Sequence, residues 1–329
     1  MILAGDVGGT KVNLALFEVV EGTPQPVAER SYVSRDYPDC LSLLEQFLKE
    51  TQPKITHACL GVAGPVKEGR CSITHLPWTL DVRDLKQLFN TDSVFLINDL
   101  AAMAHAVPCL SEGETAVIQP GQGGPDEIMG VLAAGTGLGQ AFLIPESEGR
   151  YRALETEGGQ CDFAPRTELE AHLFESIRRK AGRVCIEDIL SGPGLIRLYE
   201  FFKERNGAPE PRWLADDFQK QDPATVISQS ALAKKSKTCE SALELFVSIC
   251  GAVAGNLALQ ILARGGIYLG GGIAPEILPL LQTDVFLEAF RDKGEFRDFM
   301  MQVPVKVIMN KRAPLFGSAY FALGEKVIR

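Results

Sequence analysis

The hydrophobic positions of the chain follow the two-residue period of strands in some segments and the period of about 3.6 residues of helices in others. Residues 2–20 read as two strands around a turn at 6–10, because Val12, Leu14 and Leu16 alternate with polar or smaller neighbours. Apolar runs predict further strands at 57–62, 94–97, 128–134, 141–144, 267–269 and 303–309. Helices are expected at 38–50, 82–88, from 100 onward, and at 171–180, 195–206, 241–263 and 315–327. Strands that alternate with helices of this size predict α/β layers with a mainly parallel sheet.

One pattern occurs twice: an apolar strand, a glycine-rich turn and a second strand. The first copy turns at residues 6–10 and the second at residues 135–139. The chain has 329 residues, 46% of them apolar, which is enough for about two domains. The weak repeat therefore predicts duplicated α/β domains that face each other.

Several signals mark boundaries between elements. The pattern breaks near 107–109, and a stretch rich in glycine and proline follows at 119–125. Residues 167–170 have the Thr-x-x-Glu spacing of a capping box before a helix, and Gly182 is the expected C-cap of that helix. The run Ser-Gly-Pro-Gly at 191–194 is expected to form a sharp turn.

Composition restricts the partners of the protein. The formal net charge is −9 and the pI is about 5.1, without a basic cluster, which disfavours binding to nucleic acid or an anionic membrane. The N-terminus lacks a basic leader, and no uninterrupted apolar run approaches the roughly 20 residues that span a bilayer. We therefore expect a cytoplasmic protein. The apolar helix at 241–263 is either domain core or the surface of a homodimer, and core is the expected role.

Cysteine and histidine offer no pattern typical of a metal site. The eight cysteines are scattered, without a Cys-x-x-Cys pair, and we expect them to be reduced and mostly buried. The histidines at 57, 75, 105 and 172 are isolated from one another. We therefore expect no metal ion bound by protein side chains alone.

A polar pair, Asn98 and Asp99, lies between the strand at 94–97 and a helical run of small residues. The C-terminal end of a buried strand is where α/β sheets present chemistry. A carboxylate in a chain with phosphate-binding turns suggests a base for phosphoryl transfer. The alternative is that Asp99 only caps the helix, because Asp is a favoured N-cap.

The glycine-rich turns are candidate phosphate sites, since glycine lets backbone N–H groups approach an anion. The first turn adds the Thr10 hydroxyl and the Lys11 ammonium, and Asp6 suits the water shell of a Mg²⁺ ion. The second turn matches neither the P-loop nor the dinucleotide-binding spacing. A third run at 270–272 would let an adenine ring pack against the backbone. The alternative for the first turn is an ordinary tight hairpin, and for the third a plain turn from strand to helix.

Three further residues are candidates for binding a polyhydroxyl ligand: Glu157, Gln160 and Glu187. Carboxylates and amides suit such a ligand because each sugar hydroxyl is both a donor and an acceptor. Taken by itself, Glu187 is typical of a solvated helix residue.

The order of these motifs resembles the hexokinase–actin–Hsp70 superfamily of sugar kinases. Within it, the chain resembles the bacterial-type glucokinases from residue 6 to about residue 318. The motifs that carry the resemblance are Gly5-Asp6-Val7-Gly8-Gly9-Thr10, Ile97-Asn98-Asp99, Ala134-Gly135-Thr136-Gly137-Leu138-Gly139, Glu157-Gly158-Gly159, Asp162-Phe163-Ala164-Pro165, Leu190-Ser191-Gly192-Pro193-Gly194-Leu195 and Gly271-Gly272-Ile273.

The resemblance implies two actin-like, RNase H-like α/β domains around a central cleft. The small domain would comprise 1–109 plus 309–329, so that the C-terminal helix completes it, and the large domain 110–308. The implied reaction is the transfer of phosphate from ATP, with Mg²⁺, to the 6-hydroxyl of glucose. The nucleotide would lie on Asp6, Gly8, Gly9, Thr10, Lys11, Gly135, Thr136, Gly137, Gly271 and Gly272. The sugar would be held by Asn98, Asp99, Glu157, Gln160 and Glu187, with Asp99 also the catalytic base.

Gln160 departs from the family pattern, which usually has histidine directly after Glu-Gly-Gly. Glutamine can donate and accept hydrogen bonds over a similar reach, but it does not titrate. The change therefore leaves the base in place and bears on the choice of sugar. The alternatives are a kinase for another hexose or an amino sugar, and a non-catalytic sugar sensor on the same fold.

Overall fold

The computed structural model describes residues 1–73, 76–124, 126–146, 149–207 and 209–324. The chain forms two compact units. Unit 1 comprises Met1–Ser111, Tyr151–Glu155 and the segment from Asn310 onward, and unit 2 comprises Glu112–Arg150 and Thr156–Met309. The predicted boundaries after residue 109 and before residue 309 lie close to two of these breaks, whereas residues 151–155 fall in unit 1.

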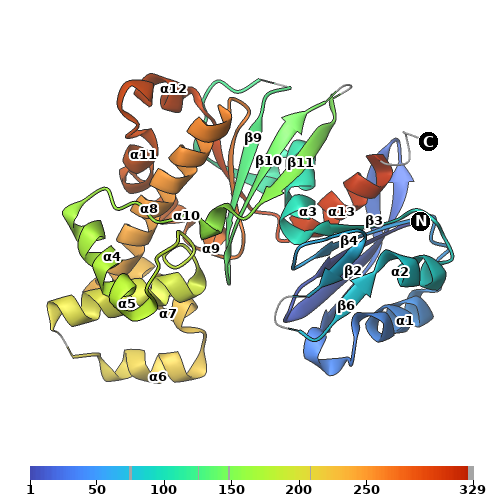
Figure 1. The fold of residues 1–329 in the computed structure, drawn as a ribbon, viewed down its shortest axis with the longest axis horizontal. Coiled ribbons are helices and arrows are strands. Elements are labelled where there is room, and N and C mark those ends of the chain that lie inside the picture. Colours follow the sequence, from blue (N-terminus) through green and yellow to red (C-terminus); the bar gives the residue numbers. More distant parts are fainter. Residues whose placement is uncertain (74–75, 125, 147–148, 208, 325–329) are drawn as a thin grey trace. The chain divides into compact units, whose positions relative to one another are not determined.

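Unit 1 is built on a five-stranded sheet with the order β3-β2-β1-β4-β7 (Figure 1). Its strands are β1 (Ile2–Val7), β2 (Lys11–Val20), β3 (Thr23–Val33), β4 (His57–Val62) and β7 (Val94–Asn98). Strand β1 pairs parallel with β4, and β4 pairs parallel with β7, whereas β1–β2 and β2–β3 are antiparallel. The predicted β1–β2 hairpin is confirmed. The prediction of a mainly parallel sheet is wrong for the β3-β2-β1 half of this sheet, where the strands pair antiparallel.

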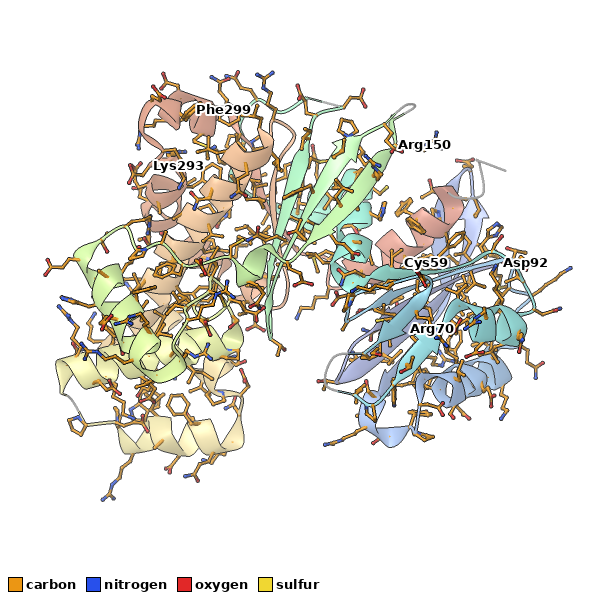
Figure 2. The ribbon with its side chains drawn as sticks, viewed as in Figure 1. Cys59, Arg70, Asp92, Arg150, Lys293 and Phe299 are labelled. Carbon is orange, nitrogen blue, oxygen red and sulfur yellow. The ribbon has the colours of Figure 1, made fainter. Side chains whose placement is uncertain are left out.

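A smaller sheet of two antiparallel strands lies beside this arrangement in unit 1. It consists of β5 (Arg70–Ser72) and β6 (Thr79–Asp81). Across it, Arg70 Nε donates to the Asp81 carboxylate at 2.6 Å (Figure 2). His75, between these strands, lies outside the described residues.

The helices of unit 1 cover both faces of the five-stranded sheet (Figure 1). They are α1 (Cys40–Thr51), α2 (Val82–Phe89), α3 (Asp99–Ala106), α13 (Ala313–Gly324) and the short η1 (Ser34–Asp36) and η2 (Val107–Cys109). Alternation along β1 divides the core: Leu3 packs with α1, whereas Ile2 and Ala4 pack with Leu315 and Ala319 of α13. The C-terminal helix therefore completes unit 1, as expected, although the predicted residues 325–327 of that helix lie outside the described residues.

The second hairpin lies within a six-stranded sheet of order β11-β10-β9-β12-β13-β8, which belongs to unit 2 apart from residues 151–155 of β11. The strands are β8 (Thr115–Gln119), β9 (Met129–Ala134), β10 (Leu138–Pro145), β11 (Tyr151–Thr156), β12 (Gly266–Gly270) and β13 (Val305–Ile308). Antiparallel pairing of β9 with β10 confirms the predicted repeat of a strand, glycine-rich turn and strand. Strands β9, β12 and β13 are parallel, and β8 pairs antiparallel at the edge, so this sheet is also mixed.

Helices make up most of the rest of unit 2. They are α4 (Glu168–Ala181), α5 (Gly192–Asn206), α6 (Arg212–Lys220), α7 (Pro223–Leu232), α8 (Lys237–Ile261), α9 (Ile273–Glu276), α10 (Leu278–Leu281), α11 (Asp284–Arg291) and α12 (Arg297–Gln302), with η3 (Glu112–Glu114), η5 (Gly158–Gln160) and η6 (Gly294–Phe296). Thr167 caps α4 by accepting from Glu170 N, and Gly182 ends it with φ +82°, as predicted. The run 191–194 is not a separate turn, since Ser191 is the N-cap and the next three residues begin α5.

Helix α8 is the centre of the unit 2 core. By length and composition it is apolar enough to cross a membrane, although its sequence holds no uninterrupted apolar run of that length. However, 78% of its most apolar window is buried. Lys293, after α11, donates to the Ala252 carbonyl and to Asn256 of α8 (Figure 2). Burial on this scale is typical of a core helix, which was the expected role.

The eight cysteines, all in the described part of the chain, form no disulfide. Six are buried and two, Cys109 and Cys161, are exposed. The prediction that they are mostly buried is confirmed.

Candidate active site

The pair Asn98 and Asp99 lies at the end of β7 and the start of α3. Asn98 has extended backbone angles, and its Oδ1 accepts from Leu100 N at 2.9 Å and from Ala101 N at 3.4 Å. Its Nδ2 donates to the Gly64 carbonyl at 3.4 Å. Asn98 is therefore the N-cap, and the interpretation that Asp99 only caps the helix is wrong. Asp99 is the first helical residue, and its carboxylate also accepts from Leu100 N, at 2.9 Å.

Asp99 has the electrostatics of a proton acceptor that works near neutral pH. Burial, followed by the negative charge of Asp6, raises the pKa of Asp99 to about 6. Two backbone N–H groups at the helix start oppose that shift, because they stabilise the carboxylate. A partly buried acid with such a pKa is a candidate functional group, since it is ionised at neutral pH but still binds a proton readily.

Asp6 belongs to the same end of the sheet as Asp99. It pairs in register with Gly61 of β4, and Gly61 pairs with Ile97 of β7, so parallel pairing brings the C-terminal ends of the three strands together. Burial raises the pKa of Asp6, while a hydrogen bond from Asn13 Nδ2 at 3.1 Å lowers it. The position of Asn13 directly across the hairpin from Asp6 was the available signal for this partner, and sequence reasoning missed it.

The first glycine-rich hairpin is closed by Gly8 N, which donates to the Lys11 carbonyl at 3.0 Å. Ser34 Oγ donates to the Gly8 carbonyl at 2.9 Å, and Ser34 N to the Thr10 carbonyl. These bonds satisfy carbonyls of the turn, while the side chains of Thr10 and Lys11 are exposed. Ser34 therefore fixes the backbone of the turn, while the Thr10 hydroxyl and the Lys11 ammonium are exposed to solvent.

The second glycine-rich hairpin of the chain, at residues 135–137 in unit 2, lies directly against the predicted Gly271–Gly272 turn. Gly271, at the end of β12, has φ +82°, and a Cβ built there would overlap the carbonyl oxygen of Ala134, the last residue of β9. Gly135 N closes the hairpin by donating to the Gly137 carbonyl, and Gly135 O accepts from Gly192 N at the start of α5. The structure thus brings together these two predicted nucleotide-binding segments.

Glu187 and Gln160 also lie together in unit 2. Gln160 Nε2 donates to Glu187 Oε1 at 3.0 Å, and Leu138 N donates to Glu187 Oε2 at 2.8 Å. Glu187 lies in a turn and is partly buried, so the interpretation as a solvated helix residue is wrong. Glu157, which precedes η5, is exposed.

Arg183 supports this group and was missed by sequence reasoning. It donates to the carbonyl oxygen of Gln160 and to Asp162 Oδ1. The chain carries no local signal for such a bond, because the partners are more than twenty residues apart. Arg183 therefore fixes the backbone that presents the Gln160 amide.

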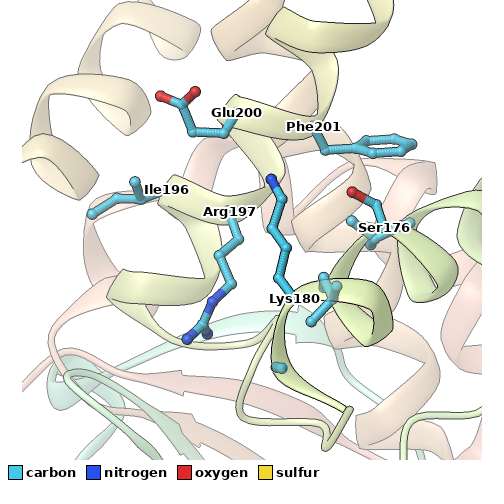
Figure 3. Close-up of a pocket in the computed structure, with 9 residues that line it drawn as sticks. Ser176, Lys180, Ile196, Arg197, Glu200 and Phe201 are labelled. Carbon is cyan, nitrogen blue, oxygen red and sulfur yellow. The ribbon is translucent and has the colours of Figure 1, made fainter. Parts of the chain in front are cut away.

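A separate apolar pocket of about 200 Å³ lies between α4 and α5 (Figure 3). Its walls come from apolar residues such as Leu173, Ile177 and Phe201. None of the predicted site residues lines it. One wall residue, Arg197, donates to the Asp188 carbonyl at 2.9 Å and so supports the turn that carries Glu187.

The chain is similar to known proteins along nearly its whole length. The family model for glucokinase matches residues 3–325. A glucokinase of Synechocystis is 39% identical, with 97% of each chain covered. The crystal structure of a glucokinase from an Antarctic psychrotroph is 31% identical, with a TM-score of 0.85 over 98% of each chain.

The chain belongs to the glucokinase family. A glucokinase-family member is a sugar kinase, so this protein is an enzyme of that class, and its fold is the two-domain actin-like α/β fold that the motifs implied. A ROK family glucokinase from Streptomyces griseus, solved with glucose and AMPPNP, has the same fold at 19% identity, with a TM-score of 0.63 over 97% of this chain and 98% of that one.

Proposed function

We propose that this glucokinase-family protein transfers the γ-phosphoryl group of ATP to the 6-hydroxyl of glucose, with Asp99 as the general base. The observation that carries the assignment is the state of Asp99. It is partly buried near Asp6 with a pKa of about 6, and Asn98 is the N-cap of α3 in its place. The resemblance of the chain to glucokinases across nearly its whole length supports glucose as the acceptor.

In the proposed mechanism, Asp99 accepts the proton of the sugar 6-hydroxyl as its oxygen attacks the γ-phosphorus in line. The base must be ionised at the moment of attack, and a pKa of about 6 leaves it largely ionised at pH 7 and above. Asn98 and Asp99 from unit 1, and Glu157, Gln160 and Glu187 from unit 2, are proposed to hold the other sugar hydroxyls.

The phosphate groups of ATP are assigned to the two glycine-rich hairpins. The N–H groups of Gly8 and Gly135 already donate within their own hairpins. The backbone N–H groups of Gly9, Thr136 and Gly137 are proposed to donate to phosphate oxygens. The Thr10 hydroxyl and the Lys11 ammonium, both exposed, would add to this cradle. The Gly271–Gly272 turn, packed on Ala134, is proposed to receive the adenine ring.

Mg²⁺ is proposed to accompany the nucleotide, with Asp6 as the protein group nearest to it. The residues suit the ion: Asp6 supplies a carboxylate, one oxygen of which accepts from Asn13, and hard cations prefer oxygen ligands and keep several waters. The ion would neutralise phosphate charge when bound. Asn13 orients the Asp6 carboxylate toward that role.

An assay of ADP release with purified protein, ATP, Mg²⁺ and a panel of hexoses tests the proposal. We expect ADP release that depends on sugar and is fastest with glucose. Release with mannose or an amino sugar in preference to glucose would favour the alternative substrate that Gln160 motivates. Sugar binding without ADP release would identify a non-catalytic sensor. A cytoplasmic location and a homodimer remain predictions, which fractionation and light scattering test.

A further inference from the structure

The Glu187 carboxylate joins two parts of unit 2 that have different proposed tasks. One oxygen accepts from the backbone N–H of Leu138, the residue that directly follows the 135–137 hairpin. The other oxygen accepts from the side-chain amide of Gln160, in the segment proposed to contact sugar. A single side chain thus bonds to both the phosphate hairpin and the sugar-binding turn.

A backbone hydrogen bond also joins the Glu187 turn to the segment that carries Gln160. Glu187 N donates to the Gly159 carbonyl at 2.9 Å. Gly159 packs so closely on Leu138 that an added Cβ would overlap the Leu138 carbonyl oxygen. Leu138, Gly159 and Glu187 therefore form a closed set of contacts, and movement of one of them displaces the other two.

The residue of the hairpin that faces the Glu187 carboxylate is a glycine, Gly137. A Cβ added to Gly137 would lie 2.7 Å from Glu187 Oε2, which is inside van der Waals contact. The carboxylate therefore occupies the space where a side chain of residue 137 would lie. Gly135, in the same hairpin, has no heavy atom within 4 Å of an added Cβ.

We propose that Glu187 is a positioning residue for the phosphate hairpin, in addition to its proposed role as a sugar ligand, and that it couples the two sites. This inference rests on the proposed function for the identity of the two ligands. An acceptor at Glu187 Oε2 holds Leu138 N and thereby fixes where the hairpin N–H groups point. Sugar that binds Glu187 and Gln160 orders this carboxylate, and by reciprocity nucleotide that orders the hairpin favours sugar binding.

Binding of AMPPNP with Mg²⁺, measured by calorimetry without any sugar present, tests the positioning role. Glu187→Met removes both acceptors at nearly constant length, and we expect it to weaken AMPPNP binding about 10-fold, as for the loss of one hydrogen bond to a charged group. Glu187→Gln keeps an oxygen that can accept from Leu138 N, so we expect AMPPNP affinity near that of the original protein. A residue that only contacts sugar would leave AMPPNP affinity unchanged in both variants, and that result would overturn the inference.

The reciprocal experiment perturbs the hairpin and measures glucose binding without nucleotide. Gly137→Ala places a methyl group against Glu187 Oε2, and we expect clearly weaker glucose binding. Gly113→Ala, outside the proposed site, adds the same methyl group where it meets nothing, and we expect unchanged glucose affinity. Equal glucose affinity in the two variants would overturn the coupling. Circular dichroism melting of each variant separates these effects from loss of fold.

The assay of ADP release keeps this inference distinct from the proposed function. If the unaltered protein releases no ADP with any hexose, the proposed function fails, while AMPPNP binding by the Glu187 variants still tests the hairpin contact. If the unaltered protein is an active kinase and the Glu187→Met variant binds AMPPNP as tightly as the unaltered protein, only the positioning role fails.

Discussion

Burial and, after it, the negative charge of Asp6 raise the pKa of Asp99, and the two carboxylates lie at the same end of the unit 1 sheet. Two neighbouring acids repel when both are ionised, so the one with the higher pKa retains a proton to a higher pH. This repulsion adds to the effect of burial and strengthens the affinity of Asp99 for a proton, which a general base needs. It also separates the tasks of the two acids, since Asp6 is proposed to face the Mg²⁺–nucleotide and Asp99 the sugar.

The first prediction concerns the base itself. Asp99→Asn keeps the size of the side chain and an oxygen that can accept from Leu100 N, but it does not accept the proton of the attacking hydroxyl. We expect kcat to fall by about 10²–10⁴-fold, the usual contribution of a general base. The coupled assay of ADP release measures this, with melting as the control for fold. A kcat near that of the unaltered enzyme would refute the role of Asp99.

The second prediction is a pH dependence. Because the ionised form of Asp99 is the active one and its pKa is about 6, kcat/KM for glucose should rise with pH and level off above about pH 7. Asp6→Asn removes the negative charge that raises the pKa of Asp99, so the acid limb of the profile should move to lower pH. The shape of the profile is the readout, because the substitution also lowers the rate through the proposed Mg²⁺ role. An acid limb that stays in place in this variant would contradict the electrostatic link.

The third prediction separates the two roles of Asn98. Asn98→Ala removes the acceptor for Leu100 N and Ala101 N, and the loss of an N-cap costs about 1 kcal/mol. Asn98→Ser retains a capping oxygen, so its melting temperature should stay above that of the alanine variant. Both variants lose the amide and should raise the KM for glucose. If the serine variant recovers the KM together with the melting temperature, the amide does not bind the sugar.

The fourth prediction concerns sugar choice. Gln160→His restores the residue usual in the family and still offers an N–H to Glu187 Oε1, so we expect KM for glucose to fall about 2- to 10-fold, the contribution of one hydrogen bond. The kcat should change little, because Asp99 is untouched. Gln160→Ala serves as the opposite control and should raise KM. An unchanged or higher KM in the histidine variant would show that the glutamine does not limit glucose binding.

Local patterns predicted the elements with strong periodicity, and long-range contacts account for what they missed. Strand β4 has the predicted bounds 57–62, because an uninterrupted buried run leaves little ambiguity. Strand β3 was not predicted, since Pro24 and Pro26 argue against a strand, yet at a sheet edge proline is tolerated.

The candidate site shows the same limit. Local sequence could not decide whether Asn98 or Asp99 caps α3, because both types favour that position. Glu187 looked like a solvated residue because its main partner, Leu138, is 49 residues away in the chain. The motifs predicted which residues form the site, and the contacts between those residues come from parts of the chain with no sequence signal in common.

The final prediction tests why the third glycine run is glycine. Gly271 has φ +82°, which strains any residue with a side chain, and an added Cβ would overlap the Ala134 carbonyl oxygen at the end of β9. Gly272, its neighbour, has open space around an added Cβ. We expect Gly271→Ala to lower the melting temperature, with a loss of stability of more than about 1 kcal/mol from backbone strain alone, whereas Gly272→Ala should melt near the original protein.

The two variants also separate packing from ligand binding. Because Gly271→Ala pushes directly on the strand end that leads into Gly135, it should weaken AMPPNP binding even at temperatures where the variant is folded. A loss of about 1 kcal/mol lowers the melting temperature of a chain of this length by only a few degrees, so binding measured well below the melting point keeps folded protein in excess. If Gly271→Ala melts like Gly272→Ala, the close packing of β12 on β9 is not what requires glycine there, and an approach of the nucleotide to the backbone becomes the remaining physical reason.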